Sequence, residues 1–244
     1  MAPETPPLPL ERAQWRAAPA TFPTARPWSV VAALIPFGET VAGDAIVDVG
    51  AGGSNAVATL LSLGADACAI DPRYQSWPSL ERDCLTYFER HEALGRLPAA
   101  REASASPIAQ QRAAFREFAA SFHDPRNADR YRAAVATNLP FAEASVDLVY
   151  SLDCLTQYLD RRFDLLEAAV EEALRVLRPG GRLVIVPFRD DVFALGYQLD
   201  RRTNQRRLER WLDERGLAWS VEDLAPTGLT GSSRLVVTRA ALDP

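Results

Sequence analysis

The sequence contains no lysine, and all 27 of its basic residues are arginines. Schiff-base enzymes, pyridoxal-phosphate enzymes, phosphate-loop nucleotidases and kinases all use a lysine at the reacting centre, so these classes are excluded. Histidine is nearly as scarce, because His91 and His123 are the only two. A Ser-His-Asp or Cys-His enzyme would have to use one of them, and the Gly-x-Ser-x-Gly turn of many hydrolases is absent.

Cysteines and long apolar runs are also few. Cys68, Cys84 and Cys154 lie far apart and form no Cys-x-x-Cys pair, so we predict neither a metal site nor a disulfide framework. No run approaches the ~18 consecutive apolar residues of a membrane helix. The first residues lack the early positive charge and apolar stretch of a signal peptide. We therefore expect a soluble, cytoplasmic protein with no membrane partner.

Basic charge is in deficit, and the formal net charge is −5. A general nucleic-acid binder usually carries a basic excess, because phosphate contacts dominate its affinity. The acidic balance therefore favours a small-molecule partner over a nucleic acid. The arginine-rich stretch at residues 201–210 is the one exception, and we interpret it as the solvated face of a surface helix. These patterns leave the oligomeric state open.

The chain divides into a short arm and one large domain. Residues 1–27 carry seven prolines and little periodicity, which predicts a flexible or extended N-terminal arm. Hydrophobic residues make up 48% of the 244 residues, enough for a single domain over 28–244. Within it, residues 77–130 are rich in Arg, Glu and Ala, with apolar residues three and four apart. This pattern predicts a helical insertion or lid, interrupted near residues 97–107.

The remainder of the domain alternates between strands and helices. Short apolar runs predict strands at 45–50, 65–71, 132–141, 145–151 and 182–188. Amphipathic segments predict helices at 29–35, 54–63, 163–177 and 205–215. Two last strands, at 217–224 and 233–240, have no helix between them and should pair antiparallel. We predict an α/β, Rossmann-like fold: a seven-stranded sheet of five parallel strands and a terminal antiparallel hairpin, with helices on both faces.

A glycine-rich turn follows the first strand, with the sequence Asp48-Val49-Gly50-Ala51-Gly52-Gly53-Ser54. Such a turn lets a ligand approach the backbone closely, although a tight turn without a ligand has the same pattern. The Gly-x-Gly-x-x-Gly dinucleotide pattern fits less well, because its last glycine falls on Asn55. Asp71 ends the second strand, where a carboxylate can accept both hydroxyls of a ribose or can cap the next helix.

Two further motifs give the combination its specificity. Asn138-Leu139-Pro140-Phe141 precedes the strand Ser-Val-Asp-Leu-Val-Tyr-Ser, and Glu-Glu-Ala-Leu-Arg-Val-Leu-Arg-Pro-Gly-Gly precedes the strand at 182–188. Together with the glycine turn and Asp71, they resemble the class I S-adenosylmethionine-dependent methyltransferase superfamily, most of all its small-molecule enzymes. The resemblance covers roughly residues 45–75 and 130–190. Asp71-Pro72-Arg73-Tyr74 also matches a bacterial subgroup of that superfamily.

The resemblance implies a cofactor, S-adenosyl-L-methionine, and a set of residues that bind it. These are Asp48, Gly50, Ala51, Gly52, Ser54, Asp71, Pro72, Asn138, Leu139 and Ser151. Two positions depart from the family pattern. Ser54 stands where the third glycine is usual, and Thr137-Asn138 stands where an acid usually contacts the adenine. An amide oxygen on Asn138 can still accept a hydrogen bond from the adenine edge.

Catalysis by this family depends mainly on holding the acceptor atom near the methyl group. A general base is needed only where the acceptor must lose a proton. We name Asp153, after the fourth strand, and His123, in the insertion, as candidate catalytic residues, although each has an alternative role as a helix cap or a surface side chain. Tyr74, Trp77, Tyr150 and Tyr158 would line an acceptor pocket or belong to the core.

The sequence therefore predicts an enzyme that transfers a methyl group from S-adenosylmethionine to a small-molecule acceptor. Two alternatives remain. A methyltransferase fold can bind the cofactor yet catalyse a non-methylating reaction or act as an interaction subunit. A nicotinamide oxidoreductase is disfavoured by the terminal hairpin and by the Arg-Val-Leu-Arg-Pro-Gly-Gly segment.

Overall fold

A mixed sheet runs through the centre of the molecule in the computed structural model, which describes residues 25–95, 108–156, 162–189, 198–224 and 233–240. Within these residues seven strands lie in the order β3-β2-β1-β4-β5-β7-β6. Their bounds are Ala45–Val49 (β1), Asp66–Ile70 (β2), Tyr131–Arg132 (β3), Val146–Leu152 (β4), Leu177–Val186 (β5), Ala218–Asp223 (β6) and Ser233–Thr238 (β7). Strands β1 to β5 pair in parallel, and β7 pairs antiparallel with both β5 and β6. The predicted fold class is confirmed.

The structure differs from the predicted boundaries in the segment after β2 and at the start of β5. The expected strand at 132–141 is only the two-residue β3, followed by a loop with an isolated bridge between Val135 and Asn138. The loop residues Ala134, Ala136 and Leu139 are nevertheless buried, which explains their strand-like apolar pattern. β5 begins at Leu177 and holds Arg-Pro-Gly-Gly as a bulge, because pairing with β4 shifts between Val146 and Leu148.

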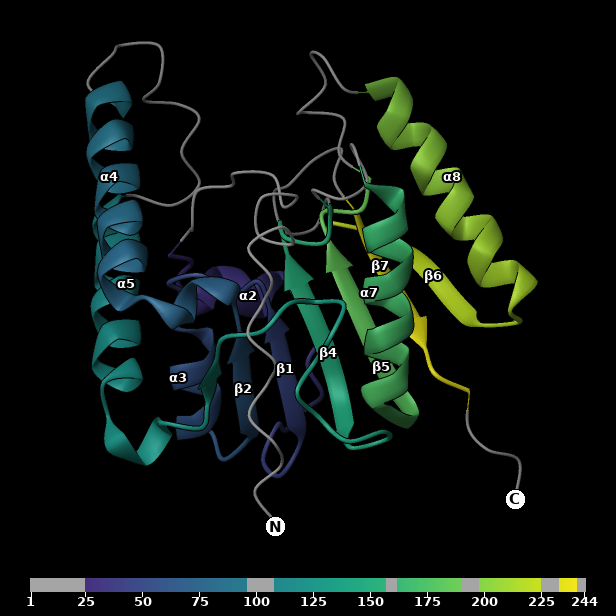
Figure 1. Ribbon diagram of the computed structural model, residues 1–244, viewed down its shortest axis with the longest axis horizontal. Helices are drawn as coiled ribbons and strands as arrows, with labels where there is room; N and C mark the ends of the chain where they lie inside the picture. The colour runs from purple at the N-terminus through teal and green to yellow at the C-terminus, as the bar shows by residue number, and fades with distance from the viewer. Residues whose placement is uncertain (1–24, 96–107, 157–161, 190–197, 225–232, 241–244) are drawn as a thin grey trace.

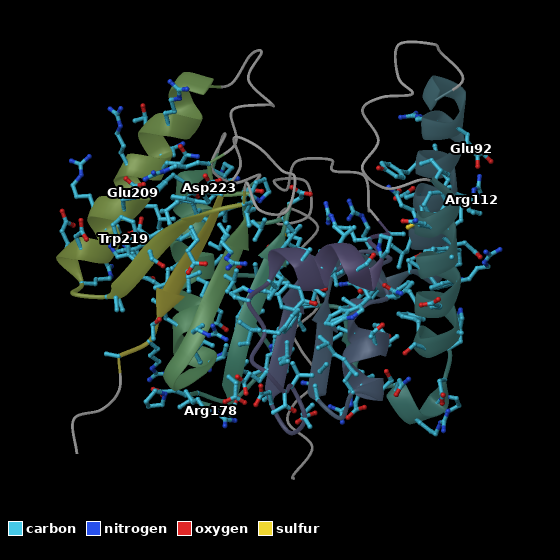
Figure 2. All side chains as sticks on the ribbon, turned by 180° about the vertical axis from the view of Figure 1, so that it is seen from behind. Glu92, Arg112, Arg178, Glu209, Trp219 and Asp223 are labelled. Atoms are coloured by element: carbon cyan, nitrogen blue, oxygen red, sulfur yellow. The ribbon has the colours of Figure 1, made fainter. Side chains whose placement is uncertain are left out.

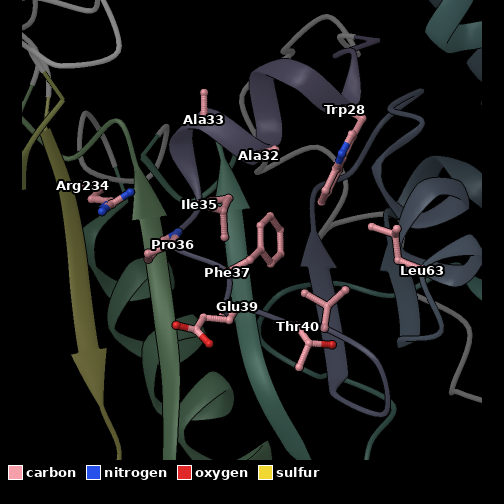
Figure 3. Close-up of a pocket in the computed structure, with 12 residues that line it drawn as sticks. Trp28, Ala32, Ala33, Ile35, Pro36, Phe37, Glu39, Thr40, Leu63 and Arg234 are labelled. Carbon is pink, nitrogen blue, oxygen red and sulfur yellow. The ribbon is translucent and has the colours of Figure 1, made fainter.

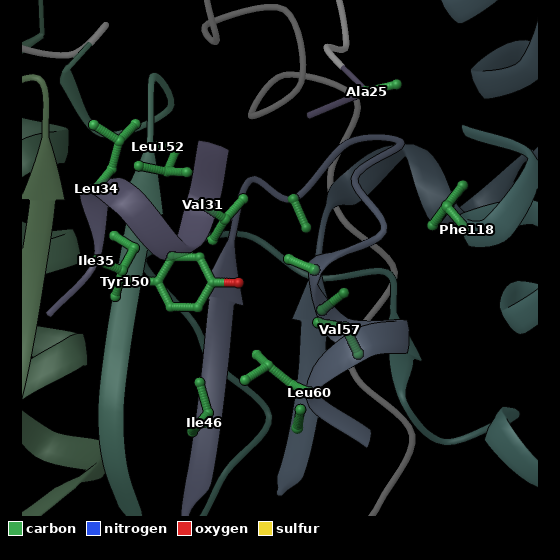
Figure 4. Packing of buried hydrophobic residues seen from close by; sticks show 14 of the residues in the cluster. Ala25, Val31, Leu34, Ile35, Ile46, Val57, Leu60, Phe118, Tyr150 and Leu152 are labelled. Atoms are coloured by element: carbon green, nitrogen blue, oxygen red, sulfur yellow. The ribbon is translucent and has the colours of Figure 1, made fainter. Parts of the chain in front are cut away.

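Side chains alternate between the two faces of the sheet, as the two-residue period of a strand requires. Ile46, Leu148 and Tyr150 face one core cluster (Figure 4), and Val47, Val149 and Leu183 face the other. The first cluster is covered by α2 (Trp28–Leu34), α3 (Ala56–Ser62), α4 (Trp77–Gly95) and α5 (Ile108–Phe122). The second is covered by α7 (Phe163–Val176) and α8 (Gln198–Glu214), so helices lie on both faces (Figure 1).

The insertion consists of α4 and α5, which pack together as an antiparallel pair beside α3 (Figure 1). Their contact is aromatic: Phe115 and Phe118 stack near Trp77, and Phe88 meets the edge of Phe115. On the outer side, Arg112 Nε lies 2.9 Å from Glu92 Oε1, and Figure 2 places these two side chains on the helix pair. The helical insertion is thus part of the first core cluster rather than an appendage.

The predicted arm and insertion lie only partly within the described residues. Ala25 is fully buried, so the last residues of the predicted arm pack against the domain, whereas residues 1–24 and the interruption at 97–107 lie outside the described residues. The division into an arm and a single domain stays a prediction. Among the described helices, none has the combined length and apolar character of a membrane span.

Candidate functional site

The glycine turn joins the carboxyl end of β1 to α3 in a conformation that requires glycine. Gly50 has a φ of +77° and Gly52 a φ of +56°, a region that side chains other than glycine rarely adopt. The Gly50 N–H donates to Ile70 O of β2 at 2.7 Å, which folds the turn over the neighbouring strand. The predicted turn residues Gly50, Ala51 and Gly52 therefore lie at the carboxyl edge between β1 and β2.

Asp71 fastens this turn to the exit of β2. Its Oδ2 accepts the Gly52 N–H at 3.0 Å, and its Oδ1 accepts the Arg73 N–H at 2.8 Å. Its side chain is 2% exposed, and burial raises its pKa, while the Arg73 guanidinium and the two N–H groups act in the opposite direction. Asp71 is thus the N-cap of the short 3-10 turn Pro72–Gln75 and a clamp on the glycine turn at the same time.

Tyr74 completes the clamp. Its hydroxyl donates to Gly52 O at 2.9 Å, so the Asp-Pro-Arg-Tyr segment holds both the N–H and the carbonyl of Gly52. The tyrosine ring is buried among Phe118, Phe122 and Tyr131. Pro72 starts the 3-10 turn, where its missing N–H costs nothing. Tyr74 is therefore a core residue whose hydroxyl hydrogen-bonds to the turn, and it does not line an acceptor pocket.

Asp48 lies beneath the turn, paired with Tyr150 across β1 and β4. The Tyr150 hydroxyl donates to Asp48 Oδ2 at 2.9 Å, and Asp48 is 4% exposed. Burial raises the pKa of Asp48 from 3.8 to about 7, although the Tyr150 hydrogen bond and the Arg26 charge lower it. Tyr150 is fully buried, so it too is a core residue.

This raised pKa predicts a stability difference that depends on pH. Between about pH 4 and pH 7 the folded chain binds the Asp48 proton more tightly than the unfolded chain does. The stabilisation that comes from this proton is therefore lost as the pH rises. Relative to Asp48→Asn, the wild type should lose up to about 4 kcal/mol of unfolding free energy across that window. Urea unfolding at a series of pH values measures it. Glu39→Gln, at an exposed position, is the control, and parallel profiles for wild type and Asp48→Asn would contradict the prediction.

Ser54 and Asp153 are both bound by Arg26, which lies just before α2. The Ser54 hydroxyl donates to Arg26 O at 3.0 Å, and the Arg26 guanidinium donates to Leu152 O at 3.4 Å and forms an ion pair with Asp153. Ser54 thus connects Arg26 to the glycine turn. Ser54, which we predict to contact the cofactor, also has a hydrogen-bond partner within the protein.

The residues after β4 close over the turn from the other side. A side chain at Gly50 would overlap Cβ and Sγ of Cys154, so these two residues touch. Burial raises the pKa of the Cys154 thiol to about 12, which makes it a poor nucleophile. Ser151 is fully buried, and its hydroxyl accepts the Leu155 N–H at 3.2 Å. Ser151 therefore orders the segment after β4 from within.

The remaining predicted residues contact other parts of the chain. Asn138 is exposed in the loop after β3, while Leu139 is buried and its N–H donates to Glu172 Oε1 at 2.7 Å. His123 is exposed at the end of α5, where its ring meets the edges of Trp77 and Phe122. The two candidate catalytic residues, Asp153 and His123, thus contact different parts of the chain within the described residues. Tyr158 lies outside them.

The glycine turn and Asp71 are separate from the pocket in Figure 3. That cavity, of about 580 Å³, is lined by α2, by the loop at 35–41, by Leu63 and by Arg234 of β7. None of the predicted cofactor residues lines it. The candidate site is therefore defined by the polar groups at the carboxyl edges of β1, β2 and β4.

Two contributors to this site had no sequence signal. Arg26 belongs to the proline-rich arm, whose lack of periodicity gave no indication that it returns to the sheet edge. Glu117 of α5 accepts a hydrogen bond from Asn55 Nδ2 at 2.6 Å, directly after the glycine turn. Both interactions join segments far apart in sequence, which a local pattern does not report.

Comparisons with known proteins match parts of this chain to methyltransferases. Residues 99–185 match the family model of a methyltransferase domain. O-methyltransferase resE from Aspergillus sclerotiorum is 46% identical over 55 residues, which cover 22% of this chain and 19% of that protein. The matched segment thus spans about a fifth of the length of this curated relative.

Solved structures with a related course of the chain include two from prokaryotes. A putative S-adenosyl-L-methionine-dependent methyltransferase from Methanococcus maripaludis has a TM-score of 0.44 at 14% identity, covering 83% of this chain and 80% of that one. The geranyl diphosphate C-methyltransferase from Streptomyces coelicolor has a TM-score of 0.46 at 15% identity, covering 83% and 75%.

Proposed function

We propose that this chain is a class I S-adenosylmethionine-dependent methyltransferase that transfers a methyl group to a small-molecule acceptor, which the methyltransferase-domain match over residues 99–185 and the strand order of the sheet support. The observation that carries the proposal is the clamp at the carboxyl edge of β1 and β2. The left-handed glycines follow β1, which together with β4 forms the point where the strand order reverses, and the Asp71 carboxylate holds them from the end of β2. Ligands of open α/β sheets bind at such switch points.

The residues of this site fit the cofactor. Each Asp71 oxygen accepts one backbone N–H, and Oδ2 also lies 3.9 Å from the Arg73 guanidinium; in the proposal the remaining lone pairs accept the ribose hydroxyls. The glycine turn brings bare backbone to the same edge. Asp48 adds a carboxylate beneath the turn, where a cationic ligand would favour its ionised form. In the proposal, Asn138 approaches the adenine from the loop after β3.

When bound, the cofactor supplies a methyl group that its sulfonium has already activated. The chain's own task is to hold the acceptor atom in line with that methyl and to exclude water. Where the acceptor must lose a proton, we assign its acceptance to Asp153, whose side chain is 44% exposed at the end of β4. His123 would serve only an acceptor that extends to the end of α5.

The small-molecule acceptor and the cytoplasmic location belong to the same proposal. The net charge of −5 disfavours a nucleic-acid substrate, and three free cysteines suit a reducing compartment. Oxygen acceptors are the first class to test, because the curated relative is named an O-methyltransferase.

Calorimetry tests the cofactor. We expect S-adenosylhomocysteine to bind and NAD and NADP to give no signal, because the turn lacks the third glycine of the dinucleotide pattern. Preference for a nicotinamide cofactor would refute the assignment. Incubation with methyl-labelled S-adenosylmethionine and a panel of phenols, amines and carboxylic acids then tests transfer. Binding without transfer to any acceptor would favour the alternative, a methyltransferase fold with a non-methylating or structural role.

A further inference from the structure

Arg26 holds two ends of the candidate site together. Its backbone carbonyl accepts the Ser54 hydroxyl beside the glycine turn, while its guanidinium binds Leu152 O and the Asp153 carboxylate after β4. The arginine side chain is only 19% exposed, and its charge reaches Asp48 below the turn and Tyr87 on α4. A cation therefore connects the glycine turn after β1 with the segment at the end of β4.

Asp153, its partner, is held in an unusual backbone conformation. Its φ is +56°, which costs a residue other than glycine free energy, although Asp and Asn tolerate it best. Its N–H donates to Val186 O at 2.8 Å, so β5 fixes the backbone while Arg26 fixes the side chain. With 44% of that side chain exposed, water can replace the guanidinium around the carboxylate.

The position of Arg26 relative to Asp71 suggests what else it can bind. Asp71 marks the ribose end of the proposed ligand, at β2. β1 lies between β2 and β4, so a substituent that leaves the ribose across the glycine turn reaches the end of β4. The cofactor's amino-acid portion would bring its carboxylate to this end of the site, and a guanidinium can pair with a carboxylate in bidentate fashion.

We propose that Arg26 exchanges partners: the guanidinium that holds Asp153 in this structure releases it to bind the carboxylate of the cofactor's amino-acid portion. This inference rests on the proposed function. A guanidinium binds one carboxylate at a time in bidentate geometry, so the carboxylates of Asp153 and of the cofactor compete for Arg26. Cofactor binding thereby frees Asp153 for the acceptor, which orders the two binding events. Arg26 is a cofactor-binding residue in this scheme.

The test compares two probes, S-adenosylhomocysteine and 5′-methylthioadenosine, which lacks the amino-acid portion. Calorimetry should show Arg26→Gln weakening S-adenosylhomocysteine about ten- to hundredfold with 5′-methylthioadenosine unchanged. Asp153→Asn, which keeps size and backbone tolerance, should tighten S-adenosylhomocysteine severalfold, because it removes the competing charge. In the double variant that gain should vanish. Arg82→Gln removes an exposed arginine that pairs with its sequence neighbour Asp83, and is the matched control.

The outcomes separate the two proposals. Equal weakening of both probes by Arg26→Gln would make Arg26 a structural residue and overturn the exchange. Unchanged S-adenosylhomocysteine affinity in Asp153→Asn would also overturn it, and this variant stands even if Arg26→Gln fails to fold. If the wild type binds S-adenosylhomocysteine and Arg26→Gln binds it equally well, the proposed function stands and only the exchange is refuted. If the wild type does not bind S-adenosylhomocysteine, the proposed function and the exchange are both refuted.

Discussion

Gly50→Ala is expected to abolish binding of S-adenosylhomocysteine and to lower the free energy of unfolding by about 2–5 kcal/mol. Two effects add at this position. An alanine pays the strain of a φ of +77°, about 1–2 kcal/mol, and its methyl group collides with the Cys154 side chain. The collision can be relieved only by moving the segment after β4, which also carries Asp153. Urea unfolding and calorimetry measure the two losses.

Gly43→Ala is the matched control. Gly43 has a φ of +84°, yet a side chain there meets nothing within 4 Å. It should show the backbone strain alone and leave ligand affinity unchanged. If Gly43→Ala and Gly50→Ala lose the same stability, the contact between the glycine turn and Cys154 has no energetic weight, and the close packing at this edge is not what defines the site.

Asp71→Ala should combine a loss of stability with a ten- to hundredfold loss of affinity for S-adenosylhomocysteine. The substitution leaves the N–H groups of Gly52 and Arg73 without their acceptor, at about 1–3 kcal/mol for each N–H that stays buried. Removing a buried carboxylate, whose pKa burial raises, offsets part of that loss. Urea unfolding and calorimetry again measure both quantities.

The chain supplies its own control for this experiment, because the tripeptide Asp-Pro-Arg occurs twice. Asp124 caps the 3-10 turn Pro125–Asn127 as Asp71 caps Pro72–Gln75, and it accepts the Arg126 N–H at 2.9 Å. Asp124→Ala should slightly weaken the fold and leave ligand affinity unchanged. A folded Asp71→Ala variant with wild-type affinity would restrict Asp71 to the role of a cap.

The repeated tripeptide also marks the limit of sequence-based prediction. The local turn follows from Asp, Pro and Arg in that order, and it forms at both places. Yet burial raises the pKa of Asp71, whereas hydrogen bonds from Arg126 lower the pKa of Asp124 to about 2. The two carboxylates differ in their surroundings, because buried Asp71 also accepts the Gly52 N–H, whereas Asp124 is bound by the Arg126 guanidinium. Local propensity predicts the cap, and tertiary placement decides whether a ligand can use it.

The fold was predictable because buried parallel strands and glycine turns have strong local signatures. Val47, Val49, Cys68 and Ile70 alternate with residues that face the opposite core cluster, so apolar runs on β1 and β2 identify both strands. The loop after β3 was mistaken for strand because Ala134 and Ala136 are buried against the sheet without pairing. Ser54 looked like a defect in the glycine motif, and its bond to Arg26 O shows its structural use.

The insertion has a thermodynamic consequence through its contact with the glycine turn. A side chain at Gly53 would lie 2.7 Å from Phe115, and Glu117 holds Asn55, so α5 and the turn share one interface. Any ligand that shifts α5 must then change the free energy of the turn, and any ligand that tightens the turn must act back on α5. By linkage, the helix pair makes affinities on its two sides reciprocal, each ligand raising or lowering the other's by the same factor.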